Sequence, residues 1–301
     1  MDAPELVALM LADGRLPTGG HTQSAGLEPA VRAGLGADGN HLEDIAAYAR
    51  DRLRTVTRVE AAVAVVTRHL ILDPSTSPAN PPAVAALPRH TPPSRGDRLR
   101  SSPPSRESWL VKPSPNPRLE EPAAGGRADG AGWTEVRAGV GRGVELGGAV
   151  GMELRTVEQA WAARTPSQVL RGVSRRQGRL LVRLAGRVWP EVLRYLARDA
   201  EVARPIVLGV VGAVTGLTAE QLARIVAYDD AQTVVSASLK LLPVDPADAA
   251  VWLAGLHGDI ERLVTDVAPL TEIEKIPAAG APLIDVFAHR HAAERMRLFH
   301  A

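Results

Sequence analysis

The chain has no cysteine and few aromatic residues. Without cysteine, disulfides, thiolate metal sites and cysteine nucleophiles are all excluded. Aromatic residues make up 3% of the chain although 45% of it is hydrophobic, so the core must come from Ala, Leu and Val. Small and unbranched residues of this kind favour helices that pack closely. A length of 301 residues is enough for one large domain or two small ones.

The chain also lacks a strong charge bias, a long apolar run and a nucleotide-binding loop. Its net charge of +1 gives no bulk attraction for nucleic acid or a membrane surface, so neither is expected as a partner. No apolar run reaches the roughly 18 residues of a membrane span, and Asp2 and Glu5 replace the basic start of a secretory signal. We therefore expect a cytoplasmic protein. There is no Gly-Lys-Ser/Thr, so no P-loop is present and the chain is not expected to hydrolyse a nucleotide.

Composition changes sharply at Asp73, and 13 of the 24 prolines lie between residues 73 and 130. Such a segment cannot bury enough apolar surface to offset its ordering entropy. We predict a Pro/Ser/Arg/Gly-rich insertion at 73–156, mostly disordered, with a helix near Val144–Val157 as an open alternative for its last part. The insertion separates residues 1–72 from 157–281, the two parts of one helical domain, and residues 282–301 form a C-terminal tail. With no strand alternation, the predicted fold is all-α, a single helical bundle.

Several helix starts are marked by capping residues. Asn40 and Glu43 have capping-box spacing before an apolar-periodic run from Leu42 to Leu72. The same kind of signal opens helices at Thr165-Pro166-Ser167-Gln168, at Thr218 with Gln221, and at Asp245-Pro246. The last of these is expected to continue to about Val267. Residues 202–216, with three glycines among valines, indicate a closely packed buried helix.

Residues 12–28 form a short, glycine-dense connection between two apolar runs, and we call it the signature segment. Its glycines, with Pro17, can shape an active-site loop, a ligand cradle or a docking surface. A serine nucleophile would use His21 and Ser24, but neither a third orienting group nor a G-x-S-x-G elbow is present. Ser24 is better interpreted as a helix cap. In that case Pro29 lies past the first turn and bends the helix.

Other motifs favour ordinary structural roles. Residues 34–39 match G-x-G-x-x-G but follow an expected helix, so they indicate a helix–helix loop rather than a dinucleotide site. The carboxylate pairs Asp229/Asp230 and Glu153/Glu158 are expected on solvated helix faces, with paired catalytic acids as the alternative.

The tail combines both phenylalanines of the chain, Phe287 and Phe299, with aliphatic and arginine residues. This mixture is enriched in interface cores, so we predict a partner-docking element; the alternative is a helix docked on its own core. His289, His291 and His300 raise a nickel or zinc site as a further alternative. On a helix, however, His289 and His291 point about 200° apart.

Arginines recur every four residues from Arg171 to Arg187, and no acidic residue lies between Arg171 and Trp189. The arginine stems could simply cover a helix flank. Alternatively, they form a surface complementary to an acidic partner.

These segments together resemble the UreF family of urease accessory proteins. The resemblance rests on four stretches in the family's order: Leu11–Glu28; Ala163–Pro166 with Ser174–Arg179; Val207–Gly209 onward to Thr215–Leu217; and Pro282–Asp285 with Arg290-His291 and Arg297–Phe299. It covers the chain except roughly residues 73–156, where the family is typically uninterrupted. His21-Thr22-Gln23 and Pro29 depart from the family's pattern.

The resemblance implies a helical, dimer-forming scaffold that acts with UreD (also called UreH) and the GTPase UreG to deliver nickel to apo-urease. It implies no catalytic residue, no metal ligand and no cofactor of its own, with GTP bound by the partner and nickel handled by the complex. A nickel-binding metallochaperone that uses His21 and the tail histidines is the alternative. The expected partner-binding residues are Pro17, Gly19, Gly20, His21, Ser24, Gly26, Glu28, Arg175, Arg179, Arg183, Leu283, Asp285, Phe287, Arg290, His291, Arg297, Leu298 and Phe299.

Overall fold

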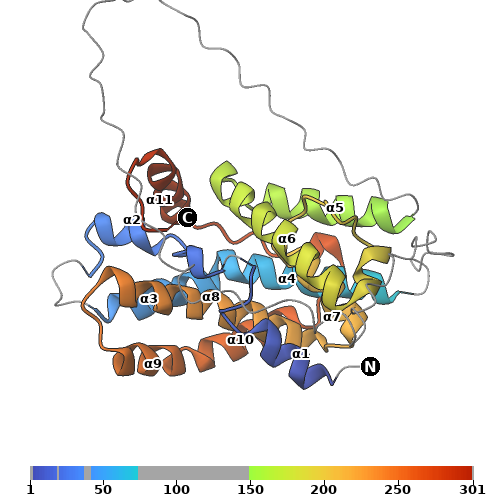
Figure 1. Cartoon of the computed structure of the whole chain (residues 1–301), viewed down its shortest axis with the longest axis horizontal. Helices are drawn as coiled ribbons and strands as arrows, with labels where there is room; N and C mark the ends of the chain where they lie inside the picture. Colours follow the sequence, from blue (N-terminus) through green and yellow to red (C-terminus); the bar gives the residue numbers. More distant parts are fainter. Residues whose placement is uncertain (1–2, 19, 37–41, 74–148, 300–301) are drawn as a thin grey trace, which may run out of the picture. The chain divides into compact units, whose positions relative to one another are not determined.

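The structure, a computed structural model, describes residues 3–18, 20–36, 42–73 and 149–299. Every regular element in these ranges is helical, which confirms the predicted all-α class (Figure 1). Most of the predicted insertion lies outside the described residues, but its last residues begin a helix at Ala149. The helices are α1 (Pro4–Leu11), α2 (Leu27–Arg32), α3 (Asp44–Arg54), α4 (Val56–Leu72), α5 (Ala149–Ala163), α6 (Gln168–Val188), α7 (Arg204–Thr215), α8 (Ala219–Leu241), α9 (Pro246–Gly255), α10 (His257–Val267) and α11 (Pro282–Ala293).

Helix α4 lies at the centre of the bundle and packs against α7, α8, α5 and α3 (Figure 1). Its residues from Ala61 to Thr67 are all buried, because neighbouring helices cover every side. Gly209 of α7 packs directly against α4, since a Cβ there would lie 2.6 Å from the Ala64 carbonyl oxygen. The expected close-packed glycine helix is therefore confirmed. Among the described helices, none combines the length and apolarity needed to cross a bilayer.

The helix boundaries differ from the sequence expectations in three places. The run from Leu42 to Leu72 breaks at Thr55, whose φ of −122° and ψ of −98° are not helical, and α3 begins after Glu43 with no side-chain cap. Asn40 lies outside the described residues. Ser167, not Thr165, caps α6, accepting a hydrogen bond from the Leu170 N–H at 3.3 Å. The helix that Asp245 opens ends at Gly255, and α10 starts anew after Leu256.

The capping box of α8 is confirmed by reciprocal hydrogen bonds. The Gln221 N–H donates to Thr218 Oγ1 at 3.1 Å, and the Thr218 N–H donates to Gln221 Oε1 at 2.9 Å. Asp245 caps α9 with Pro246 in its first turn, as the sequence predicts.

The expectation that Asp229 and Asp230 lie on a solvated face is wrong. Asp230 accepts hydrogen bonds from Arg52 at 2.6 and 3.0 Å and from the Thr57 hydroxyl at 2.6 Å, while Asp229 pairs with Arg204 at 2.8 Å. Arg52 is 7% exposed and Asp230 14%. The charges lie inside the bundle because α8 turns this face toward α3, α4 and α7. Charges buried in this way require partners.

Glu60 of α4 joins this cluster and makes stability depend on pH. Burial raises the pKa of Glu60 to about 7, because desolvation outweighs the attraction of Arg204 and Arg52. The folded state therefore keeps a proton that the unfolded state releases near its ordinary value of 4.5. Stability from this group is lost as pH rises from about 4.5 to 7.

We expect Glu60→Gln to remove this loss. The unfolding free energy of the wild type, relative to the variant, should fall by roughly 1–3 kcal/mol between pH 5 and 7, since each pKa unit corresponds to about 1.4 kcal/mol. Urea titrations at several pH values measure the difference. Glu272→Gln, at an exposed pair with Lys275, is the control and should change little. Parallel curves for wild type and Glu60→Gln would contradict the assignment.

Candidate partner-binding site

The signature segment runs from the end of α1 to the first turn of α2. Asp13 and Arg15 form a turn in which the Arg15 N–H and side chain both donate to the Asp13 carboxylate at 2.9–3.0 Å. Ala25 and Gly26 then adopt left-handed φ values of 52° and 78°. A Cβ at Gly26 would come within 2.8 Å of the Tyr48 hydroxyl, which donates to the Ala25 carbonyl at 2.9 Å. Gly26 is thus required by both its backbone conformation and this close approach.

Ser24 supports α2 in a different way from the one expected. The N-cap of α2 is Gly26, and the buried Ser24 hydroxyl accepts a 3.3 Å hydrogen bond from the Glu28 N–H. Because Ser24 is 0% exposed, it is not placed to act as a nucleophile. Pro29 is the third residue of α2, where its missing N–H breaks no helical hydrogen bond, so the expected bend has no cause there.

The C-terminal segment folds back onto α2. Helix α11 packs against α2 and α6 and buries Ile284, Ala288 and His291 (Figure 1, α11 in dark red beside α2). The chain then continues past Glu294, and Phe299 is buried at 4% exposure. Of the two interpretations of the tail, the structure shows a segment docked on its own core.

One carboxylate holds this arrangement together. Glu28, 1% exposed, accepts hydrogen bonds from the Leu298 N–H at 2.8 Å, the Phe299 N–H at 2.9 Å and Arg32 at 2.6 Å. Its Oε2 also lies 2.9 Å from Nε2 of the buried His291. We call Glu28 with these donors the Glu28 clamp. It joins the signature segment to residues about 270 positions away.

The electrostatics of the clamp favour an ionised Glu28. Burial by itself raises the pKa of this carboxyl, but the two backbone N–H donors and His291 together bring the pKa below its ordinary value. Arg32 reinforces the clamp, since it also pairs with Glu294 and donates to the Met296 carbonyl at 2.9 Å. Sequence reasoning missed Arg32, although its position four residues after Glu28 is the spacing of a helical ion pair.

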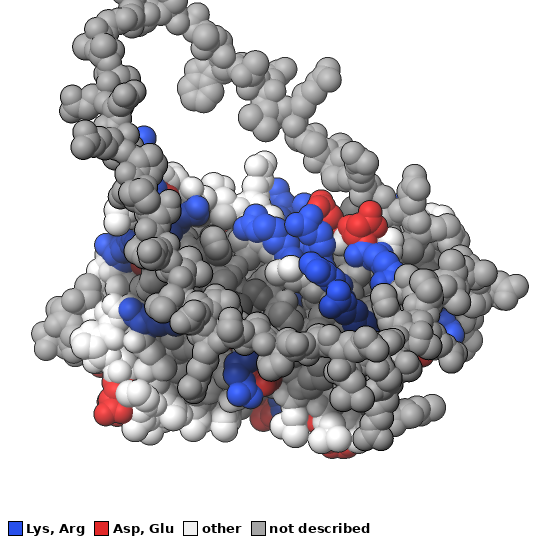
Figure 2. Space-filling view, viewed as in Figure 1, with Lys and Arg blue, Asp and Glu red and all other residues white. Residues whose placement is uncertain are grey.

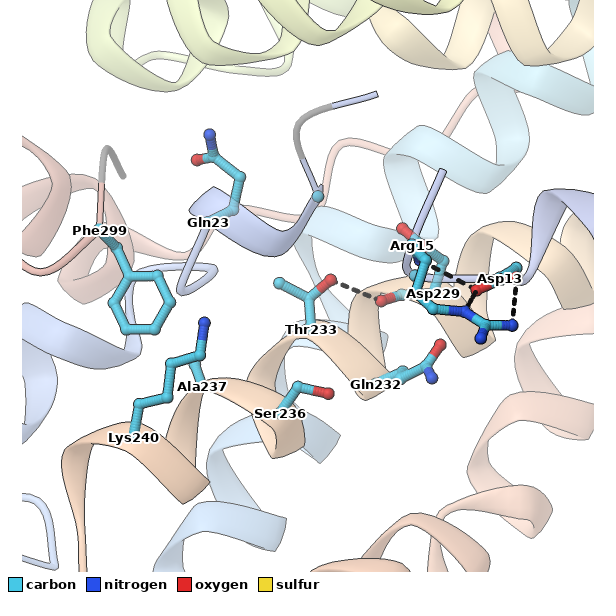
Figure 3. Close-up of a pocket in the computed structure, with 12 residues that line it drawn as sticks. Asp13, Arg15, Gln23, Asp229, Gln232, Thr233, Ser236, Ala237, Lys240 and Phe299 are labelled. Carbon is cyan, nitrogen blue, oxygen red and sulfur yellow. Dashed lines mark hydrogen bonds and ion pairs between the residues drawn. The ribbon is translucent and has the colours of Figure 1, made fainter. Parts of the chain in front are cut away.

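A cavity of about 380 Å³ lies between the signature segment, α8 and the end of the tail (Figure 3). The Phe299 ring closes one side, and Lys240 Nζ lies 5.2 Å from the ring centroid, within cation–π range. Asp13 and Arg15 lie at the other side, and α8 contributes Gln232 among other polar residues. Because Phe299 is positioned by Glu28, the clamp also shapes this cavity.

A larger apolar groove of about 910 Å³ lies between α2, α3 and α11. Leu283 and Phe287 of α11 line it, and Leu283 is 67% exposed. Asp44, Asp51 and Arg54 of α3 also line it. The groove therefore combines a mostly apolar lining with charged side chains of both signs from α3.

The predicted arginines lie on α6, and part of them are already paired. Arg175 donates to Glu158 at 2.8 Å and lies 5.7 Å from the Trp161 ring centroid, and Arg179 pairs with Glu201 at 3.2 Å. Glu158 is therefore not on a free solvated face. Arg183 is exposed. Figure 2 shows basic side chains gathered over α6, with acidic side chains beside them near α5.

The tail histidines do not share a site. His289 is exposed and its Nδ1 lies 2.9 Å from the Asp285 carbonyl oxygen, whereas His291 is buried against Glu28. Within the described residues there is no cluster of three or more His, Asp or Glu side chains that could hold a metal. Side-chain burial raises the pKa of Asp285, with His289 opposing it. His300 and the side chain of His21 lie outside what the structure describes.

The structure separates the predicted contact residues by exposure, with Asp285 and Phe287 partly buried. Leu283, Arg290, Arg297 and Leu298 are exposed and free to meet a partner. Five others are buried and cannot contact a partner in this conformation: Ser24, Gly26, Glu28, His291 and Phe299. They support the residues that are exposed at the surface. Gly20 has open space around it, Pro17 is exposed at the segment's surface, and Gly19 lies outside the described residues.

Comparisons with known proteins agree with the resemblance. The family model described as UreF matches residues 142–257. Urease accessory protein UreF of Mycobacterium sp. (strain JLS) is 30% identical over 291 residues, covering 97% of this chain and 96% of that protein. The proteins of the same name from Mycobacterium marinum and Mycolicibacterium vanbaalenii are 30% and 29% identical, each with 97% of this chain and 96% of the relative covered. This chain therefore belongs to the UreF family of urease accessory proteins.

Proposed function

We propose that this chain is a non-enzymatic scaffold for urease maturation, acting in the cytoplasm with UreD and the GTPase UreG so that nickel is inserted into apo-urease. Membership of the family supports the role in maturation. The Glu28 clamp is the observation that carries the scaffold assignment. Its buried carboxylate is fully engaged in holding the C-terminal segment against α2, which is a structural role rather than a catalytic one. The surface joins both ends of the chain.

The apolar groove beside the clamp is the proposed UreD contact. An exposed leucine next to a partly buried phenylalanine, with a polar rim, matches the composition of a protein interface. Nickel is the cargo of the assembly in this proposal, GTP belongs to UreG, and a homodimer of this chain is its working form. The exposed arginines of α6 offer a surface for another member of the assembly.

The alternative of a nickel-binding metallochaperone would need a change of conformation. His289 and His291 have separate partners on different sides of α11, so they cannot chelate one ion as placed. Equilibrium dialysis with nickel addresses this alternative: micromolar binding that disappears on replacing both histidines would favour it over the scaffold.

The scaffold proposal is tested with Leu283→Asp. Urease activity is measured in a reconstituted host that carries the cognate urease and accessory genes, and UreD is co-purified with the chain. We expect the wild type to support activation and the variant to lose most UreD binding, about 30-fold or more, because a charge in an interface core costs at least about 2 kcal/mol.

Val251→Asp on α9 is the matched control, since Val251 is also 67% exposed but does not line the groove. It should leave activation and UreD binding unchanged. If the Leu283→Asp variant bound UreD as well as the wild type does, the groove would not be the UreD contact. Absence of activation by the wild type would refute the proposed function itself.

A further inference from the structure

Positive charge is concentrated in one part of this chain. Residues 164–204 contain ten arginines and three acidic residues, whereas the whole chain has a net charge of only +1. This stretch includes α6, which has no acidic residue from Gln168 to Val188. Such asymmetry within a nearly neutral chain indicates a local electrostatic role rather than a requirement for solubility.

Three of these arginines form one outward strip on α6. Arg176, Arg183 and Arg187 are exposed, and at 100° per residue they fall within about 40° of one another around the helix. They extend over about 16 Å at 1.5 Å per residue. We call this strip the arginine face. Leu180, 38% exposed, lies beside this strip, about 40° around the helix from Arg176.

The arginines of the face differ from the other arginines of α6 in having neither a carboxylate nor a carbonyl partner among the described residues. Arg175 and Arg179 pair with Glu158 and Glu201, and Arg171 donates to the carbonyls of residues 165 and 166 at 2.6 and 2.8 Å. Within the part of the chain that the structure describes, no acidic group lies within ion-pair distance of Arg176, Arg183 or Arg187. Like charges held side by side repel one another, so the strip is a surface that an external anion would stabilise.

The composition of the face favours a protein over a polyanion. Guanidinium groups bind carboxylates through two parallel hydrogen bonds, and arginine is enriched in protein interfaces. Leu180, beside the strip, offers apolar contact, which a phosphate backbone does not use. The apolar groove is a different kind of surface, because its lining is mostly apolar and its charged side chains, Asp44, Asp51 and Arg54, are of both signs.

We propose that the arginine face is a second docking surface, which receives an acidic protein surface of the urease assembly independently of the apolar groove. The proposal rests on the proposed function and specifies one of its contacts. It replaces the expected set Arg175, Arg179 and Arg183 with Arg176, Arg183 and Arg187 as the principal contacts. Arg175 and Arg179 instead already have carboxylate partners within the chain.

The test uses a triple variant in which Arg176, Arg183 and Arg187 are each changed to Gln. Binding of the full chain to purified cognate UreD, UreG and apo-urease is measured at about 50 and 300 mM NaCl. We expect one of these proteins to bind about tenfold or more weakly to the variant, with a salt dependence that the variant has lost. The corresponding triple Lys variant should recover part of the affinity, since it keeps the charge without the bidentate geometry.

A control variant neutralises three cations that already have carboxylate partners: Arg224, Arg262 and Lys275. It changes the net charge equally and should bind like the wild type. Equal loss in the control would show a general charge effect and overturn the proposal. So would unchanged binding by the triple Gln variant, or a preference of the face for duplex DNA or anionic vesicles.

Two further outcomes separate this proposal from the proposed function. Leu283→Asp should retain the salt-dependent binding, because the two surfaces are independent. If the wild type and the triple Gln variant activate urease equally well, the arginine face is not a docking surface, and the proposed scaffold function is unaffected. If the wild type does not activate urease, the proposed function fails first.

Discussion

Replacing Glu28 with alanine is expected to lower the free energy of unfolding by about 3–5 kcal/mol and to release the C-terminal segment. The change removes the acceptor of the Leu298 and Phe299 N–H groups and of His291, and in the docked conformation it leaves the buried Phe299 N–H and His291 without this partner. It also frees Phe299 from the cavity wall. Urea unfolding measures the loss, and hydrogen exchange of residues 282–299 measures release of the segment.

Glu294→Ala is the matched control for this experiment. Glu294 pairs with the same Arg32 but is 30% exposed, so its loss should cost less than about 1 kcal/mol. The pH dependence gives a second check. Because the pKa of Glu28 is lowered in the folded state, its contribution is present above the ordinary value of 4.5 and is lost as pH falls below it. A variant with an unchanged exchange pattern in the tail would contradict the clamp.

The second large effect is expected for Asp230→Ala, which should also destabilise the fold by about 3–5 kcal/mol. The substitution leaves Arg52 charged and 93% buried, and removes the acceptor of the Thr57 hydroxyl. It acts at the contact of α3, α4 and α8, so the whole bundle should lose stability cooperatively. Thermal and urea unfolding both report the change.

Asp266→Ala is the control, because Asp266 is 50% exposed in its pair with Arg58 and should contribute little. A double variant, Arg52→Met with Asp230→Leu, should recover most of the lost stability, since an apolar pair avoids the unpaired buried charge. If Asp230→Ala were no more destabilising than Asp266→Ala, the charge cluster would have to be solvated in solution.

The local signals in the sequence predicted the fold class well and the helix ends unevenly. Capping pairs such as Thr218 with Gln221 depend only on neighbouring residues, and the structure has them as predicted. The break at Thr55 could not be predicted in this way, because apolar periodicity continues through it. Asp229 and Asp230 were misplaced for a similar reason: a charged pair on a helix is usually solvated, and only the neighbouring helices decide otherwise.

In the candidate site, too, local features could be predicted from the sequence and long-range contacts could not. The sequence predicts a role for the conformational freedom of Gly26, and its positive φ and close contact with Tyr48 show why glycine is needed there. The composition of the signature segment and of the tail predicts that each is a contact region. That Glu28 binds the backbone of residues 298 and 299 could not be seen, because no periodicity or spacing relates residues so far apart.

By itself, the sequence determined the all-helical class, the family and the absence of cysteine and P-loop chemistry, because these follow from composition and local motifs. Only the tertiary structure decided which charges are buried, which arginines have partners and where the tail docks. Pairing and burial depend on contacts between distant helices. The same carboxylate or guanidinium is a solvated group on one face and a structural anchor on another.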